Sequence, residues 1–277
     1  MTDLVQTELF RVEVPDEEPY IYKAWPRQVV FHTATQKYLL YGGAMGGAKS
    51  HALRQHGYMT CLSVPGASVL LLRRTFRQLE KTHIERIMLD APRLGAVYYK
   101  AEKILRFPSN NSLLTCGHCE TEADVIDHLG TEYDLILFDE AVTFLEKQFT
   151  LISSRARTTK PGLVPRVLLG SNPGPAQWLK ERFITKTCAA PGYNPDDYAF
   201  VPAKLADNPS IVDQEGYLAT LDNLPDALAK MYRDGNWDVF EGQYFEEWNP
   251  NLHVQRLHCD PTWPRVRCLD WGYSKPG

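Results

Sequence analysis

Residues 41–50 read Tyr-Gly-Gly-Ala-Met-Gly-Gly-Ala-Lys-Ser and directly follow the short apolar run Tyr38-Leu39-Leu40. Four glycines allow this backbone to curl so that successive N–H groups point inward, which is how a loop binds phosphate oxygens. Lys49 can reach the β and γ phosphates of a nucleotide, the Ser50 hydroxyl can ligate Mg²⁺, and a helix beginning here would attract negative charge at its N-terminus. The stretch therefore predicts a P-loop, or Walker A motif, that binds ATP. The predicted contacts are Gly43, Gly46, Gly47, Ala48, Lys49 and Ser50.

One position departs from the usual G-x-x-x-x-G-K-[ST] pattern, because Ala48 stands where the last glycine is expected. We expect alanine to be tolerated there if its φ angle is negative. A glycine-rich turn that merely precedes a lysine is the alternative, since a motif on its own is only a hypothesis. Other parts of the chain have to decide between the two.

A second apolar run, Leu135–Phe138, ends in the adjacent carboxylates Asp139 and Glu140. This is the pattern of a Walker B strand. Asp139 would hold Mg²⁺ together with Ser50, and Glu140 would orient and deprotonate the attacking water. The alternative is a strand followed by the acidic start of a helix. The two motifs in this order favour a hydrolytic site with Glu140 as its catalytic base.

Further apolar runs alternate with helical patterns, which predicts an α/β fold. We expect a P-loop NTPase of the ASCE type, with a central, mostly parallel sheet flanked by helices and a small helical lid. Short strand-like pieces between residues 97 and 116 predict a meander at the sheet edge.

The run Val164–Leu169 ends in Gly170-Ser171-Asn172-Pro173-Gly174. Because α/β proteins bind ligands at the carboxyl ends of parallel strands, Ser171 and Asn172 could sense the γ phosphate. An arginine finger is also expected to stabilise transition-state charge, and the sequence does not say whether it acts on its own site or on a neighbour's. The candidates are Arg73, Arg74, Arg155 and Arg157.

Trp25 and Gln28 lie upstream of the loop, in the order Trp25-Pro26-Arg27-Gln28. In many nucleic-acid-driven ATPases a glutamine so placed reads the adenine edge and an aromatic ring stacks on the base, so we predict both as ATP contacts. The alternative is a proline that starts a helix, followed by a surface glutamine. Composition shifts predict an extended arm over 1–20, an ATPase core over 21–190, a lid and linker over 191–245, and a further linker with the start of a new domain over 246–277.

The 277 residues carry a net charge of −4 and have no general basic character. A DNA contact would therefore need a local basic patch, for which residues 155–160 and 180–186 are candidates. No apolar run approaches the roughly 18 residues that span a bilayer, and the acidic N-terminus is unlike a signal peptide, so we expect an intracellular protein with no membrane partner. The six cysteines lack the second close pair that a zinc site needs.

In this order the motifs resemble the large subunit of tailed-phage terminases, the viral DNA-packaging motor. The resemblance covers roughly residues 20–277. Its pieces are Trp25-Pro26-x-Gln28, the loop at 42–50, Leu70–Arg74 with the following Thr-Phe-Arg-Gln-Leu-Glu, Leu135–Ala141, Gly170–Gly174 with Trp178–Phe183, Asp207-Asn208-Pro209, and Gly235-Asn236-Trp237 with Gly242–Phe245.

The resemblance implies that the protein couples ATP hydrolysis, with Mg²⁺, to the movement of double-stranded DNA into a procapsid, in the cytoplasm of the infected bacterial host. It implies a homo-oligomeric ring, usually of five subunits, on the portal, loaded by a small terminase subunit, and it allows a monomer in isolation. Ser171 and Asn172 would belong to the turn that couples hydrolysis to movement. A ribonuclease-H-like nuclease usually follows the ATPase, and Asp270 matches its first metal-binding carboxylate. Because the other nuclease carboxylates are absent, we expect no DNA cleavage by this chain alone.

Three alternatives stay open at this point. Another DNA-driven P-loop ATPase, such as a helicase, would share the chemistry but separate strands. A nucleotide-dependent switch would signal without translocation, although the sequence has no Asn-Lys-x-Asp guanine reader. A structural assembly component would have a vestigial site, against which Lys49, Ser50, Asp139 and Glu140 argue.

Overall fold

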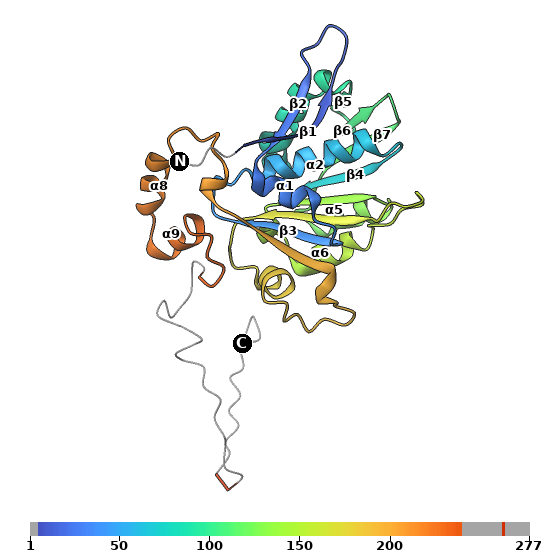
Figure 1. The fold of residues 1–277 in the computed structure, drawn as a ribbon. Coiled ribbons are helices and arrows are strands. Elements are labelled where there is room, and N and C mark those ends of the chain that lie inside the picture. The colour runs from blue at the N-terminus through green and yellow to red at the C-terminus, as the bar shows by residue number, and fades with distance from the viewer. Residues whose placement is uncertain (1–4, 240–261, 264–277) are drawn as a thin grey trace. The chain divides into compact units, whose positions relative to one another are not determined.

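The computed structural model describes residues 5–239 and 262–263. Its main feature is an eight-stranded sheet in the order β10-β3-β9-β8-β4-β7-β6-β5 (Figure 1). The neighbours from β10 to β7 pair in parallel, whereas β6 and β5 are antiparallel, which confirms the predicted α/β class and the edge meander. The strands are β1 (Thr7–Val12), β2 (Tyr20–Ala24), β3 (Tyr38–Gly43), β4 (Ser68–Arg73), β5 (Val97–Tyr99), β6 (Ile104–Phe107), β7 (Ser112–His118), β8 (Leu135–Asp139), β9 (Arg166–Ser171) and β10 (Tyr198–Ala203).

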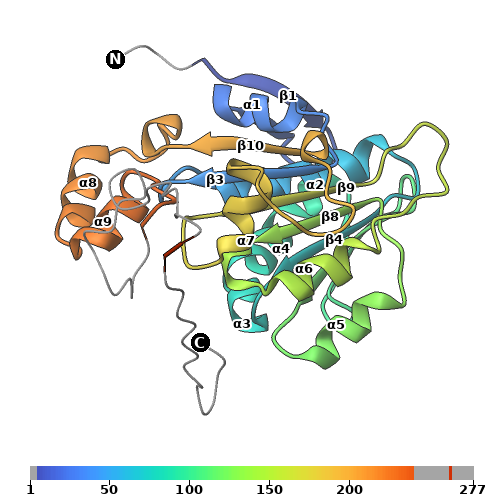
Figure 2. The same cartoon turned by 90° about the horizontal axis from the view of Figure 1, so that it is seen from below.

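Helices cover both faces of this sheet, and α1 lies on the opposite side from α5 and α6 (Figure 2). The α-helices are α1 (Pro26–Thr33), α2 (Lys49–Ser63), α3 (Phe76–Leu79), α4 (Glu85–Asp90), α5 (Glu122–Leu129), α6 (Glu146–Ser153), α7 (Gln177–Leu179), α8 (Gln214–Asp222) and α9 (Asp226–Tyr232). Two π-helical turns, η1 (Glu80–Ile84) and η4 (Lys180–Ile184), and four short 3₁₀ turns, η2 (Pro92–Leu94), η3 (Ala141–Thr143), η5 (Pro195–Asp197) and η6 (Leu205–Asp207), complete the described elements.

The central strands are apolar throughout because successive side chains enter two different cores. Leu39 and Tyr41 of β3 pack with Leu53 of α2 in one core. Leu40, between them, packs in the other core with Trp178 of α7. This double burial explains why these strands are continuous hydrophobic runs rather than alternating patterns.

Two segments differ from the sequence-based expectation. Residues 7–12, which we expected in an extended arm, form β1 and pair antiparallel with β2, whose Tyr20 and Tyr22 are buried. Strand β10 was not predicted, and it pairs with β3 beyond residue 190, where we expected the ATPase core to end. The prolines and glycine just before β10 concealed it, because such residues usually mark a linker.

The chain divides into two compact units, residues 1–242 and 243–277. The elements above belong to the first unit, and the structure describes only Thr262 and Trp263 of the second. Asp270, the predicted nuclease carboxylate, lies outside the described residues. Within the described ranges, no helix is both long and apolar enough to cross a membrane.

Candidate active site

The predicted phosphate loop lies at the carboxyl edge of the sheet, between β3 and α2. Gly43 has φ 139°, and a side chain there would collide with the carbonyl oxygen of Ala203 in β10. Residues 45–51 line a cavity of about 200 Å³ together with Glu140 and Asn172. The loop and residues that follow β8 and β9 in the chain therefore meet at one cavity, as the parallel order of the strands requires.

Ala48 adopts the left-handed conformation, with φ 54° and ψ 31°. The condition under which we expected alanine to be tolerated, a negative φ, is therefore not met. The loop needs a left-handed residue immediately before α2, and an alanine Cβ makes that conformation unfavourable by about 1–2 kcal/mol. Glycine is usual in the motif because it adopts this conformation without that cost.

We expect Ala48→Gly to raise the free energy of unfolding by about 1 kcal/mol, because relief of the left-handed strain exceeds the added entropy of the unfolded chain. Urea denaturation would measure the change. Ala52→Gly is the matched control, since Ala52 lies inside α2 and is fully buried. In that control the free energy of unfolding should fall by about 1 kcal/mol or more. A loss of stability in both variants would contradict the assignment of strain to Ala48.

The side chain of Lys49 is directed at its own loop. Its Nζ donates to the carbonyl oxygens of Ala44 at 2.6 Å and Gly43 at 3.3 Å. Burial lowers the pKa of the Lys49 ammonium to about 8, although the charges of Glu140 and Asp139 act in the opposite direction. An anionic phosphate group in the cavity would reverse the effect of burial.

We therefore expect ATP binding at pH 8.5 to take up about 0.7 proton, because Lys49 is largely neutral beforehand and becomes charged beside phosphate. Calorimetric titrations in two buffers of different ionisation enthalpy would measure this uptake. Lys49→Arg is the control, since arginine stays protonated throughout and should abolish the uptake. An equal uptake by that variant would show that another group takes the proton.

Asp139, at the end of β8, is buried, and each of its two carboxylate oxygens faces a hydrogen-bond donor. Its Oδ1 accepts a hydrogen bond from Ser50 Oγ at 2.9 Å, as the predicted shared metal site requires. Its Oδ2 accepts from His83 Nε2 at 2.9 Å and forms an ion pair with Arg73 Nε at 2.8 Å. Burial acts to raise the pKa of Asp139, but the hydrogen bonds from His83 and Ser50 and the charge of Arg73 outweigh it and lower the pKa. Asp139 is therefore an anion at neutral pH.

Glu140 has a different environment from its neighbour. Burial, together with the charge of Asp139, raises the pKa of Glu140, which is the direction suited to a general base. The residue also adopts the left-handed conformation, with φ 54°, and its side chain lines the cavity. Unfavourable backbone conformations of this kind are concentrated at functional sites.

The predicted Ser171 and Asn172 follow β9 at the same edge. Ser171 Oγ accepts a hydrogen bond from the Val142 N–H at 3.0 Å, so it joins the end of β9 to the segment after Glu140. Asn172 lines the cavity, and its buried Oδ1 has no hydrogen-bond partner among the described residues. An unpaired polar atom beside the phosphate loop fits a residue that contacts a ligand.

Two of the arginine-finger candidates lie near the site but are already engaged. Arg73 pairs with Asp139, as described above. Arg74 donates to Gln148 Oε1 and to the carbonyl oxygen of Cys119, both at 2.6 Å, and so fastens β4 to α6.

Arg155 and Arg157 lie at the opposite edge of the sheet. The Arg157 side chain forms an ion pair with Glu132, and the backbone of Arg155 bonds to Tyr133 just before β8. Asp139 is six residues further along that strand, about 20 Å away. Neither arginine can therefore serve as a finger at the site of its own chain.

The predicted adenine contacts, Trp25 and Gln28, do not line this cavity. Gln28 is buried, and its Oε1 accepts from the Trp25 N–H at 3.0 Å and from the Tyr22 hydroxyl at 3.3 Å. These bonds cap the start of α1 and occupy the oxygen that would read the adenine edge. The Gln28 oxygen thus caps the start of α1, where Trp25 provides the first residue of the cap, whereas the buried Gln28 Nε2 has no hydrogen-bond partner among the described residues.

Sequence reasoning missed His83 and the role of Asn208. Asn208 Nδ2 donates to the carbonyl oxygen of Gly46 at 2.6 Å, and the Met45 N–H donates to the carbonyl oxygen of Tyr232 at 2.7 Å. The segment carrying α8 and α9, orange in Figure 1, is therefore bonded directly to the phosphate loop. No sequence signal marks His83. The Asp207-Asn208-Pro209 turn was recognised in the sequence, but no function was assigned to it.

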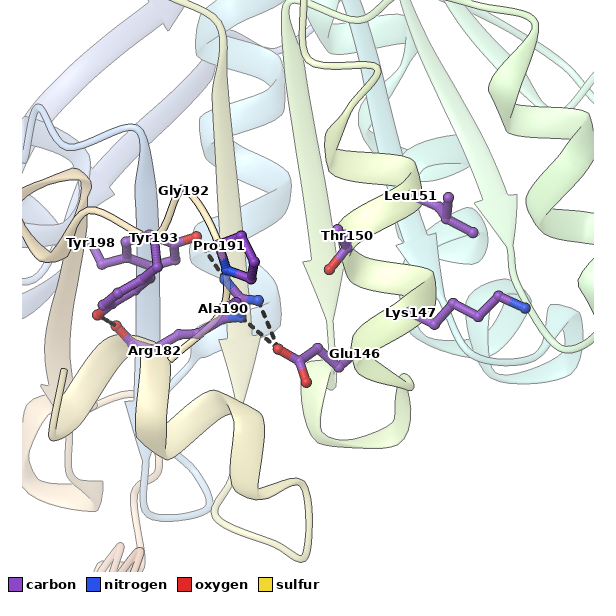
Figure 3. A pocket seen from close by; sticks show the side chains of 10 residues that line it. All are labelled: Glu146, Lys147, Thr150, Leu151, Arg182, Ala190, Pro191, Gly192, Tyr193 and Tyr198. Carbon is purple, nitrogen blue, oxygen red and sulfur yellow. Dashed lines mark hydrogen bonds and ion pairs between the residues drawn. The ribbon is translucent and has the colours of Figure 1, made fainter. Parts of the chain in front are cut away.

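A larger pocket of about 600 Å³ lies between α6 and residues 190–193 (Figure 3). Arg182 reaches across it to Glu146, with Nη2 and Oε1 2.7 Å apart, and donates to the Tyr198 hydroxyl. Other cations suspected of DNA contact are paired as well: Arg157 with Glu132, Lys160 with Asp134, and Lys180 with Asp238. These ion pairs offset part of the positive charge at residues 155–160 and 180–186.

No protein-family model matches this sequence, and no curated protein is significantly similar to it. Solved structures do match. A large terminase from a thermophilic bacteriophage superposes with a TM-score of 0.62 at 15% identity, over 76% of this chain and 53% of that one. The Thermus phage P74-26 large terminase ATPase domain gives 0.57 at 18% identity, over 78% of this chain and 94% of that one.

The chain has the fold of a phage large-terminase ATPase domain. The HK97 bacteriophage large terminase also matches, with a TM-score of 0.51 at 14% identity over 76% of this chain and 50% of that one. The first of these three terminases has been solved with ATP-gamma-S and with ADP. This chain spans about half the length of that terminase and of the HK97 terminase, and nearly all of the P74-26 ATPase domain. The structural neighbours thus agree with the family that the motifs resemble.

Proposed function

We propose that this chain is the ATP-hydrolysing motor domain of a phage large terminase, which moves double-stranded viral DNA into a procapsid. The observation that carries the proposal is the meeting of Ser50 and Asp139 at 2.9 Å beside a cavity lined by Lys49 and Glu140. These contacts support the roles that the two sequence motifs suggest for the four residues. The terminase fold and the nucleotide complexes of a structural neighbour support the same conclusion.

The residues present fit Mg²⁺. The Ser50 hydroxyl and the Asp139 carboxylate place two oxygens together, and oxygen ligands are what Mg²⁺ prefers. Among the described residues no cluster of three or more His, Cys, Asp or Glu side chains could hold a metal alone. That suits Mg²⁺, which proteins usually bind through one or two carboxylates together with the phosphates of the substrate. When bound, it would neutralise charge on the phosphate oxygens.

The residues of the chain divide the work. Lys49 would release its loop carbonyls and bind the β and γ phosphates, and Glu140 would accept the proton of the attacking water. Ser171 and Asn172 would transmit the state of the γ phosphate along β9 to the rest of the domain. An arginine finger would come from another subunit, since Arg73 and Arg74 are engaged and Arg155 and Arg157 lie too far from their own site.

The partners in this proposal follow from the motor function. They are double-stranded DNA, a small terminase subunit, the portal of the procapsid, and further copies of the chain in a ring, usually of five. The site of action would be the cytoplasm of the infected bacterium.

ATP turnover, measured with and without duplex DNA and with procapsids that carry a portal, tests the proposal. We expect hydrolysis to be stimulated by DNA and most strongly by both together. Turnover that no DNA or procapsid alters would contradict the motor function. Unwinding of a fluorescent duplex would indicate a helicase instead.

A further inference from the structure

His83 is the most completely buried titratable group beside the candidate site, with 0% of its surface exposed. It lies 56 residues before Asp139, and its Nε2 donates to Asp139 Oδ2 at 2.9 Å. Complete burial lowers the pKa of His83, although Asp139 acts in the opposite direction. The function proposed above leaves this residue without a role.

A local irregularity brings His83 to the carboxylate. The helical segment after β4 is α-helical over Phe76–Leu79 and Glu85–Asp90, but the turn Glu80–Ile84 between them is π-helical. A π turn carries one extra residue, which rotates the side chains within it relative to a regular helix. Such turns are often found at functional sites because they redirect single side chains.

The two oxygens of Asp139 consequently face different groups. Among the described residues, Oδ1 accepts a hydrogen bond from the Ser50 hydroxyl alone, on the side of the phosphate loop. Oδ2 meets His83 and Arg73, which approach from the segment after β4 and from the end of β4 itself. The carboxylate is thus fixed through one oxygen, and the other oxygen is directed at the loop.

We propose that His83 is a positioning residue that fixes Asp139 through Oδ2, so that Oδ1 is held in place as a ligand for a divalent cation bound with nucleotide. The proposal rests on the function proposed above and extends it to a residue outside the recognised motifs. Groups that hydrogen-bond to metal ligands commonly change metal affinity by 10–100-fold when they are removed.

The imidazole and Arg73 together hold Oδ2. Arg73 balances the charge of Asp139, and His83 adds a directional hydrogen bond. Its Nδ1 is buried and has no hydrogen-bond partner among the described residues, so the Nε2–H bond to Asp139 is its one described polar contact.

A purely structural histidine would behave differently on substitution. It would change the stability of the fold but leave the preference of the site for metal-bound nucleotide intact. The decisive quantity is therefore the ratio of the dissociation constants for ATPγS in EDTA and in excess Mg²⁺, measured by calorimetry. This ratio isolates the contribution of the metal, because the phosphate loop acts in both buffers.

Three variants separate the two roles. His83→Met fills a similar volume without a donor, and we expect the ratio to fall about tenfold or more. His83→Gln places an amide N–H near the position of Nε2 and should keep the ratio within about threefold of the unsubstituted protein. His128→Met is the matched control, because His128 bonds to the His118 carbonyl oxygen beside α5 and should leave the ratio unchanged. An unchanged ratio in His83→Met would overturn the proposal.

The unsubstituted protein gives a second test that does not depend on the folding of a variant. With Mg²⁺ and ATPγS bound, a two-bond ¹H–¹⁵N spectrum should show a proton on Nε2 of His83, and an unprotonated Nε2 would overturn the proposal. If the unsubstituted protein binds ATPγS in neither buffer, the proposed function fails and this inference with it. If it binds and hydrolyses ATP but His83→Met keeps the ratio, only the role of His83 fails.

Discussion

Glu140→Gln is expected to lower the rate of ATP hydrolysis by about 10²–10⁴-fold while ATP still binds, because it removes the general base and leaves the phosphate-binding groups in place. Glu140 lines the cavity together with Lys49 and Ser50, and burial with the neighbouring Asp139 charge raises the pKa of its carboxyl. An amide of the same shape cannot accept a proton from water. The variant should therefore accumulate with ATP bound.

Single-turnover hydrolysis and equilibrium binding of ATP, measured on the same preparation, would separate the two effects. The matched control is Glu122→Gln, since Glu122 is exposed at the start of α5 and pairs with Lys147 on the surface. It should hydrolyse ATP like the unsubstituted chain. Near-normal phosphate release by Glu140→Gln would refute the assignment of the base, and loss of ATP binding would assign Glu140 to nucleotide affinity instead.

The core of this site could be predicted from sequence because parallel strands impose it. Apolar runs that end in polar residues deliver those residues to one edge of the sheet, and β3, β9 and β8 are adjacent. Ser50 and Asp139 were therefore expected together although they are 89 residues apart, and their side chains meet at 2.9 Å. The motif order carried this information without any knowledge of side-chain packing.

The remaining features depend on backbone detail that residue patterns do not encode. The left-handed φ of Ala48 contradicts the usual preference of alanine, and the tight turn into α2 imposes it. His83 reaches Asp139 only through a π turn, which has no sequence signature. Arg73 was a candidate finger because it ends a strand at the site, yet the buried charge of Asp139 attracts it first. Each of these outcomes is a tertiary effect that overrides a local preference.

Between pH 6.5 and 4.5 the domain is expected to lose at least about 2–3 kcal/mol of stability, the loss expected from His32 alone, because buried histidines accept protons less readily in the fold than in the unfolded chain. His32 of α1 and His56 of α2 are each 8% exposed, and their Nδ1 atoms are 3.0 Å apart. Burial, followed by the charge of nearby groups, lowers the pKa of His32 to about 3 and that of His56 well below its usual value. One Nδ1 must donate and the other accept, which the neutral pair satisfies.

The sign follows from proton counts. Below the unfolded pKa near 6.5 the unfolded chain binds protons at both histidines, and the folded chain does not until the pH approaches the lowered values. For each such histidine, the free energy of unfolding therefore falls by about 1.4 kcal/mol per pH unit below 6.5. Above that pH its contribution to stability is complete. A loss of this size is a large part of the whole stability of many domains, about 5–15 kcal/mol.

Urea denaturation at pH 7.5, 5.5 and 4.5 would measure this loss, and carboxyl groups interfere little because they titrate near pH 4 in the unfolded chain. His56→Asn keeps a donor near the position of Nδ1 and cannot titrate, so the dependence of stability on pH should become smaller. It should not vanish, because burial also lowers the pKa of His51 to about 4 and lowers that of His83. A dependence unaltered in His56→Asn would show that the acid sensitivity arises outside this pair.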